Sequence, residues 1–267
     1  MGSTTGDDAE NQKIAQRLVS AWRTATVTEP PSAQVAELDS IRALQITRHS
    51  TALLGPDRVV GYKIGLVAES AQQAMGYAQP VFGRIYADDV SASGATLSRS
   101  AFVDPKIEPE CGLLIGSHLG GADVSTEEVR RAVAGVVPAF EIADSRYGAA
   151  ASTVGDLIAD NGAAAGAVIT LSDAIPPNTI DLSSTRLTVE LDGEPTWVDR
   201  PMPGGPSNDQ PYELLGWLVR TLATQELSLE PGQFVLTGSW VTPIDASGPI
   251  TVQASYSGFG TVSVTMS

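Results

Sequence analysis

Residues 106–116 read KIEPECGLLIG, where two glutamates flank a proline just before a run of small and apolar residues. Alternate side chains of a β-strand share one face, so a strand here would point Glu108 and Glu110 to the same side. Two like charges in a half-buried place are costly unless a cation neutralises them or one carboxyl stays protonated. In isolation, such a pair most often faces water at a strand end. The stretch therefore predicts a strand, and Pro109 places it at an edge, a bulge or a barrel rim.

A third glutamate, Glu141, lies in the short apolar stretch PAFEIADSRY at residues 138–147, where an unpaired charge would again be costly. The sequence has two histidines and one cysteine, which excludes a zinc site of thiolates and imidazoles and an internal disulfide. The same scarcity argues against serine and cysteine hydrolases, because each needs a histidine base beside its nucleophile. Carboxylates alone suit a hard divalent ion. The sequence predicts Mg²⁺ or Mn²⁺, with Glu108, Glu110 and Glu141 as ligands and open positions for substrate oxygens.

Charge and hydropathy restrict the classes of partner. The formal net charge is −15, from 31 acidic and 16 basic residues without a basic stripe, which argues against nucleic acid as a partner. No apolar run approaches the roughly 20 residues of a membrane span. The first residues lack the basic and apolar regions of a secretory signal and predict a disordered tail at residues 1–9. We therefore expect a cytoplasmic protein.

The hydrophobic pattern changes along the chain from helical to strand-like. Amphipathic helices are predicted at residues 10–24 and 34–47, separated by Pro30 and Pro31. In the second helix Val35, Leu38 and Ile41 are expected on the buried face. The remaining helices are predicted at residues 69–76, at 125–137 behind a capping box, and at 208–225 with Asp209 as the cap.

Strands are more numerous than the helices that a parallel sheet would need as crossovers. They are predicted at residues 59–66, 82–90, 106–116, 138–147, 166–171, 185–191, 233–238, 250–256 and 260–266. This count favours a β-rich α+β fold. We expect a helical N-terminal portion at residues 10–55 and a β-rich catalytic domain at residues 56–267.

Three further stretches carry candidate functional residues. Lys63 lies in the apolar strand VVGYKIGL, where a lysine usually extends its amine to solvent at a sheet edge; beside a metal, its pKa would instead be lowered and the amine could exchange protons with a substrate or bind a carboxylate. Asp160 and Asn161 open a turn followed by small residues that let backbone approach a ligand. LTGSW at residues 236–240 is either a tight turn or the polar rim of a pocket.

Together these motifs are specific. GYKIG at 61–65, the Glu-x-Glu of IEPEC, PAFEIADSRY at 138–147, ADN at 159–161 and LTG at 236–238 occur in an order and at spacings that resemble the 2-keto-4-pentenoate hydratase and 4-oxalocrotonate decarboxylase family of the fumarylacetoacetate hydrolase superfamily. The resemblance covers nearly the whole chain from about Gln12. It implies a mixed β-roll or barrel of the fumarylacetoacetate hydrolase type, assembled as a homo-oligomer, with one Mg²⁺ or Mn²⁺ on the three glutamates. It also implies that Lys63 is the active-site lysine and that Asp160 is an acid that orients the site.

The resemblance implies a metal-dependent lyase that acts on 2-oxo or 2-hydroxydienoate acids from aromatic-ring breakdown. Such an enzyme forms a metal-stabilised enolate, and the first hypothesis is hydration of a 2-hydroxypenta-2,4-dienoate-like substrate to a 4-hydroxy-2-oxo acid. Alternatives are a 4-oxalocrotonate-type decarboxylase, a tautomerase or C–C hydrolase acting on an unusual 2-oxo acid, and a non-catalytic partner subunit. Association with a pathway enzyme is a further expectation.

The chain departs from the family pattern at positions that would shape a pocket. Val81 stands where the family has an acidic or polar residue, and GAAAS at 148–152 replaces an aromatic residue followed by lysine. A Gly-His-Pro motif becomes Asp-Gln-Pro at 209–211, and bulky Trp240 follows the LTG turn. For a substrate with a second carboxylate, Arg84 or Arg146 is the expected cationic partner. The expected substrate-binding residues are Val81, Arg84, Arg146, Ser239 and Trp240.

Overall fold

Two mixed β-sheets form most of the molecule. The computed structural model describes residues 5–148, 150, 152–201 and 209–267. The larger sheet has the strand order β2-β1-β10-β5-β6-β7-β3, with β11 alongside β5. Its strands are β1 (Val59–Gly65), β2 (Val81–Tyr86), β3 (Val90–Ser91), β5 (Pro105–Ile115), β6 (Val133–Asp144), β7 (Ala164–Ile169), β10 (Phe234–Ser239) and β11 (Ile244–Asp245). The α+β fold with mixed sheets is as predicted.

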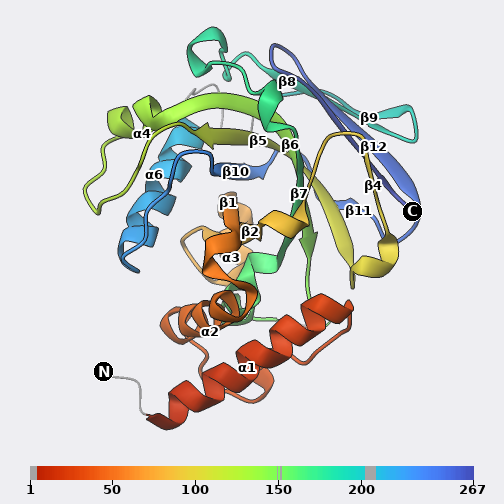
Figure 1. Cartoon of the computed structure of the whole chain (residues 1–267). Coiled ribbons are helices and arrows are strands. Elements are labelled where there is room, and N and C mark those ends of the chain that lie inside the picture. The colour runs from red at the N-terminus through yellow and green to blue at the C-terminus, as the bar shows by residue number, and fades with distance from the viewer. Residues whose placement is uncertain (1–4, 149, 151, 202–208) are drawn as a thin grey trace.

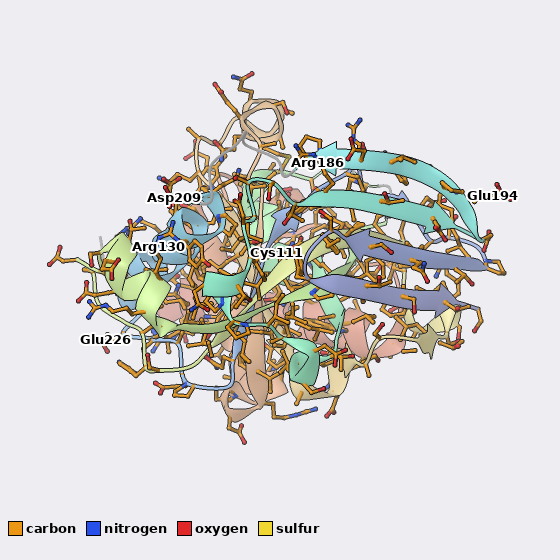
Figure 2. All side chains as sticks on the ribbon, turned by 90° about the horizontal axis from the view of Figure 1, so that it is seen from above. Cys111, Arg130, Arg186, Glu194, Asp209 and Glu226 are labelled. Atoms are coloured by element: carbon orange, nitrogen blue, oxygen red, sulfur yellow. The ribbon has the colours of Figure 1, made fainter. Side chains whose placement is uncertain are left out.

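The smaller sheet has the strand order β4-β13-β12-β8-β9 and covers one side of the larger sheet (Figure 1). Its strands are β4 (Ala95–Leu97), β8 (Arg186–Leu191), β9 (Glu194–Pro201), β12 (Ile250–Tyr256) and β13 (Gly260–Met266). Alternate residues of β12, Val252 and Ala254, are fully buried in one hydrophobic core together with Cys111 and Leu113 of β5. Figure 2 shows Cys111 near the middle of the molecule and Glu194 at the outer tip of the β8–β9 hairpin.

Six α-helices are present among the described residues: α1 (Thr5–Thr24), α2 (Ser40–Leu54), α3 (Glu69–Met75), α4 (Thr126–Ala132), α5 (Val154–Ala159) and α6 (Gln210–Ala223). Helices α1 and α2 lie together at the end of the molecule away from the smaller sheet (Figure 1). They share a buried cluster with α5, in which Ile14 and Ile46 pack with Ile158. None of the described helices is long and apolar enough to cross a lipid bilayer. The division of the chain at residues 55 and 56 stays a prediction.

Several element boundaries differ from those predicted. Helix α1 begins at Thr5, within the predicted tail. Helix α2 begins at Ser40 rather than at residue 34, because the Asp39 side chain accepts a hydrogen bond from the Arg42 N–H and caps the helix there. Val35 and Leu38 are buried although they precede the helix, whereas Ile41 is 70% exposed. The prediction that Ile41 packs inward is therefore wrong.

The helix predicted at residues 125–137 is half helix and half strand. Its capping box is present, with Ser125 and Glu128 bonded reciprocally, but α4 ends at Ala132 and β6 begins at Val133. The valines that follow are β-branched and pair along β5, so strand packing prevails over the helical spacing. Asp209 occupies the N-cap position of α6 without a capping hydrogen bond and forms an ion pair with Arg130. Asp209 is thus the N-cap residue as predicted, although its side chain does not form the expected hydrogen bond to the first turn of α6.

Candidate metal and substrate site

Strands β5 and β6 bring three glutamates together. The two strands pair antiparallel over their length, and Glu108 lies directly opposite Glu141 in this register. Glu110 follows two residues later on the same face of β5, as the alternation of a strand requires. One carboxylate oxygen from each of the three glutamates lies within 4.8 Å of the others. The structure thus places the three predicted ligands in one cluster, from strands that are adjacent in the sheet although Glu141 is distant in sequence.

Lys63 joins this cluster from β1, which is separated from β5 by β10. Its Nζ lies 2.9 Å from Glu141 Oε1, and the residue is 5% exposed. The Lys63 amine is therefore buried and does not extend to solvent, as the amine of a strand lysine usually does. Burial alone would lower the pKa of Lys63, but the negative charges of the three glutamates outweigh it and the pKa is raised. The expectation of a lowered pKa applies to Lys63 beside a bound metal ion and stays a prediction.

Glu110 is the most deeply buried of the three glutamates. It is 0% exposed, and its Oε2 accepts a hydrogen bond of 2.7 Å from the Gly238 N–H. Its Oε1 is buried without a hydrogen-bond partner among the described residues. Gly238 has φ of +100°, and a Cβ there would lie 2.7 Å from Val67 Cγ2, so this donor requires glycine. The LTG turn therefore holds one carboxylate oxygen and leaves the other available to a ligand.

The electrostatics of the cluster fit a divalent cation. Burial, and then the charge of Glu141, raise the pKa of Glu108 to about 7. The same two causes, followed by the charge of Glu108, raise the pKa of Glu110 well above its ordinary value. Glu141 Oε1 also lacks a well-aligned hydrogen bond despite its contact with Lys63. Clustered carboxylates with free oxygen atoms and one nearby ammonium are under-neutralised, and a hard divalent ion bound by oxygen ligands would supply the missing positive charge.

Asp160 does not join the glutamates. It is buried and bonded to Arg146, whose Nε lies 2.6 Å from Asp160 Oδ1 and whose backbone N–H donates to Oδ2. Burial raises the pKa of Asp160 to about 6, against the opposing effect of Arg146. The pair fixes the turn at residues 160–164, in which a Cβ on Gly162 would lie 3.2 Å from Lys63 Cε. Asp160 and Arg146 thus stabilise a turn that packs against Lys63.

The structure separates Arg84 from the cluster. Arg84 pairs with Tyr62 in the β1–β2 ladder and Gly83 pairs with Lys63, so Arg84 and Lys63 project to opposite faces of the sheet. The guanidinium of Arg146 is bonded to Asp160 and to the carbonyl of Ala164. Neither arginine, each expected beside a second substrate carboxylate, is among the side chains brought together at the glutamates.

The other expected substrate-binding residues lie in different surroundings. Val81 is 3% exposed and borders the amine, since a Cβ on its partner Gly65 would lie 3.3 Å from Lys63 Nζ and 3.5 Å from Val81 Cγ2. Ser239 lies opposite Glu110 in the ladder, but its hydroxyl donates to the Val241 carbonyl at 2.8 Å.

Trp240 is buried in the core, with its ring centroid 5.3 Å from that of Tyr256. Its role in substrate binding stays a prediction. In the altered GAAAS stretch, Ala149 and Ala151 lie outside the described residues.

The sequence did not reveal how two residues of the quoted motifs, Gly238 and Asn161, contribute to the site. The Gly238 N–H is a backbone group, which carries no side-chain signature beyond the glycine in LTG. Asn161 accepts from the Arg84 N–H and donates to the Arg84 carbonyl, each at 2.8 Å, and thereby joins the turn to β2. Asn161 has a positive φ of +56°, a conformation that asparagine adopts more readily than most residues. The asparagine of the ADN motif is therefore the one sequence signal for this turn.

Comparisons with known proteins agree with this geometry. The family model described as fumarylacetoacetate hydrolase C-terminal matches residues 64–266. A 2-keto-4-pentenoate hydratase of Paraburkholderia xenovorans (strain LB400) is 31% identical, over 86% of this chain and 85% of its own length. A 2-hydroxyhexa-2,4-dienoate hydratase of Comamonas testosteroni is 28% identical over 93% of this chain and 94% of its own length.

A solved structure also has the same fold. It is a 4-oxalocrotonate decarboxylase from Pseudomonas putida G7, complexed with magnesium and adipate, which is 20% identical and matches with a TM-score of 0.88 over 100% of both chains. The chain belongs to the fumarylacetoacetate hydrolase family, in the group that contains the 2-keto-4-pentenoate hydratases and the 4-oxalocrotonate decarboxylases.

Proposed function

We propose that this protein is a divalent-metal-dependent lyase that hydrates a 2-hydroxypenta-2,4-dienoate-like acid to a 4-hydroxy-2-oxo acid. The observation that carries the proposal is the cluster of Glu108, Glu110 and Glu141, with carboxylate oxygens within 4.8 Å of one another and a buried lysine against one of them. Membership of the family and the similarity to two proteins named as hydratases support this reaction class.

Glu108, Glu110 and Glu141 are the proposed ligands of Mg²⁺ or Mn²⁺. When bound, such an ion would polarise the carbonyl of a 2-oxo acid and stabilise the enolate charge beside it. Within Glu110, Oε1 is the oxygen available to a metal, because Oε2 is already bonded to Gly238. Each of the two metals is present in a solved structure of similar fold, which supports both.

Lys63 is proposed to carry a proton or to hold the substrate carboxylate. Hydration of the dienol removes the proton from the 2-hydroxyl and adds one at the far end of the diene, after which water adds a hydroxyl to C4 and a proton to C3. These steps need a proton carrier beside the enol, and the Lys63 ammonium 2.9 Å from Glu141 is placed for it. Glu110 is the second candidate carrier. Asp160 is proposed to act indirectly, since its bonds to Arg146 hold the turn against Lys63.

Decarboxylation is the second candidate, because it would use the same cluster and the fold matches that of a decarboxylase. A dicarboxylate substrate needs a cation for its second carboxylate. Arg84 projects to the opposite face of the sheet and Arg146 is bonded to Asp160, so neither expected cation faces the glutamates. This arrangement supports hydration of a monocarboxylate. Val81, which replaces a polar residue, supports a less polar substrate.

The test is the ultraviolet absorbance of freshly made 2-hydroxypenta-2,4-dienoate mixed with metal-stripped protein, before and after Mg²⁺ is added. We expect loss of the diene band only with metal, no loss with Glu110→Gln, and unchanged loss with the surface control Glu194→Gln. A diene band that persists with metal, while 4-oxalocrotonate releases CO₂, would replace hydration by decarboxylation. Continued turnover of the dienoate by Glu110→Gln would contradict the proposed metal site.

The proposal also covers the oligomeric state and the cellular location of the protein. By its family we propose a homo-oligomer that acts on a small-molecule 2-oxo acid in the cytoplasm. Light scattering of the purified chain measures the first point, since a mass equal to the 27.8 kDa of one chain would contradict it. Association with a pathway enzyme can be tested by copurification with the enzyme that supplies the dienoate.

A further inference from the structure

A buried guanidinium lies on the face of the larger sheet opposite Lys63. Arg84 is 4% exposed, and its Nη2 donates to Gln225 Oε1 at 3.3 Å. No carboxylate lies within ion-pair distance of it among the residues that the structure describes. The guanidinium lies over the Phe82 ring, 5.3 Å from the ring centroid, but the ring carries no net negative charge. A buried cation is costly unless an anion neutralises it, so Arg84 still lacks a counterion at this position. The pKa of Arg84 is lowered by burial, which is the effect expected of an unpaired cation.

Two hydrogen-bond donors are unsatisfied at the same place. Nη1 of Arg84 and Nε2 of Gln225 are both buried and have no acceptor among the described residues. Buried donors are nearly always paired with protein or with ordered solvent, and two adjacent ones, one of them charged, match the paired oxygens of a carboxylate. The positive charge selects an anion over a neutral acceptor.

A cavity of about 480 Å³ adjoins these donors. It runs between the end of α2, strands β1 and β2, and the segment that follows α6, and its lining includes Thr51, Pro56, Val59, Tyr62, Arg84 and Gln225. Apolar and aromatic surface therefore lies beside the cationic end, which is the pattern of a site for a small organic molecule. The space is much larger than one carboxylate needs, so a carbon chain or ring fits with it.

The charges at the mouth limit the charge of the ligand. Arg48 is an exposed cation in the cavity lining, and Glu226 and Glu230 are exposed carboxylates in the same lining. These four charged groups, including Arg84, sum to zero, so a single negative charge can be accepted at Arg84 while a doubly charged oxyanion is opposed by the two glutamates. We propose that this cavity is a binding site for a small organic monocarboxylate, held by Arg84 and Gln225, and separate from the glutamate cluster.

The site lies behind the strand that carries Lys63. Asn161 bonds both backbone groups of Arg84, and the next residue, Gly162, packs on Lys63. Binding itself needs no metal and no turnover. The proposal can therefore be tested on metal-stripped protein, where its failure is distinct from failure of the proposed hydratase reaction.

The experiment is isothermal titration of sodium hexanoate, acetate and phosphate into metal-stripped protein, at constant ionic strength set with chloride. We expect one saturable site per chain for hexanoate, weaker binding of acetate, and no comparable binding of phosphate. Arg84→Met should weaken hexanoate binding by about tenfold or more, since it removes a charge-assisted contact. Arg131→Gln, which removes an exposed arginine on α4, is the matched control and should bind as the wild type does.

A second variant keeps the test decisive if Arg84→Met does not fold. Ala52 is exposed on α2 and lines the cavity, so Ala52→Trp should block it without disturbing the core and should abolish hexanoate binding. Absence of hexanoate binding to the wild type would overturn the proposal. So would equal binding by the wild type and both variants, or phosphate binding as tight as that of hexanoate.

Discussion

Replacing Lys63 by methionine removes the one ammonium that contacts the glutamate cluster among the described residues. At 2.9 Å from Glu141 and an effective dielectric constant of about 20, the attraction of this ion pair is about 6 kcal/mol before desolvation is subtracted. Breaking a buried pair by removing one partner costs about 3–5 kcal/mol, because the other charge stays buried and uncompensated. We expect Lys63→Met to lose about that much free energy of unfolding in the presence of EDTA.

The same substitution should strengthen metal binding. The ammonium opposes a second cation among the three carboxylates, and its removal leaves their full charge to the metal. We therefore expect saturating Mg²⁺ to restore more stability to Lys63→Met than it adds to the wild type. The assay is urea unfolding of both proteins, with EDTA and with Mg²⁺, followed by circular dichroism.

A surface lysine supplies the control. Lys106 contacts Asp104 and Asp245, but its side chain is 33% exposed, so Lys106→Met should cost no more than about 1 kcal/mol and should not alter the effect of Mg²⁺. An equal loss for Lys63→Met with and without Mg²⁺ would refute the reasoning, since it would mean that the Lys63 ammonium does not oppose a cation at the carboxylates.

Three other outcomes follow from the structure. Glu110→Gln keeps an acceptor for the Gly238 N–H but removes one charge of the cluster, so thermal denaturation should show that Mg²⁺ no longer stabilises it, whereas Glu194→Gln should behave as the wild type. Gly238→Ala puts a Cβ 2.7 Å from Val67 Cγ2 at φ of +100°, and a loss of about 1–3 kcal/mol is expected in urea unfolding; a loss below the error would show that the turn adapts freely. Asp89 has its pKa raised from 3.8 to about 6, by burial first and by Asp88 second, so the folded state binds its proton more tightly than the unfolded state does. The free-energy cost of the buried Asp89 charge is absent below pH 3.8 and complete above about pH 6. Asp89→Asn should therefore stabilise the protein by about 1–2 kcal/mol at pH 7.5, after a discount for partial exposure, and by much less at pH 4. Equal stabilisation at both pH values would contradict the raised pKa.

The candidate site was predictable where local pattern decides the structure. The alternation of β5 indicates that Glu108 and Glu110 share a face, and the structure confirms that face. That Glu141 lies opposite Glu108 depends on the pairing of β5 with β6, which no local pattern specifies. The resemblance to a known family supplied that information instead.

The errors arose where tertiary contacts decide between two local preferences. Val133 and Val136 fit a helical face by their spacing, yet pairing with β5 draws them into β6. Arg84 is a plausible partner for a second substrate carboxylate by its charge, and only the β1–β2 register shows that it projects away from Lys63. The buried pair of Asp160 and Arg146 joins side chains 14 residues apart, and neither residue type predicts the other.

The most direct test of the metal site is calorimetric titration of Mn²⁺ into metal-stripped protein, with wild type, Glu110→Gln and Glu194→Gln measured side by side. We predict one site per chain in the wild type and in Glu194→Gln, and binding weakened at least tenfold in Glu110→Gln, which loses a carboxylate that carries one of the free oxygen atoms of the cluster. Equal affinity in all three proteins, or no binding by the wild type, would contradict the assignment of Glu108, Glu110 and Glu141 as the metal site.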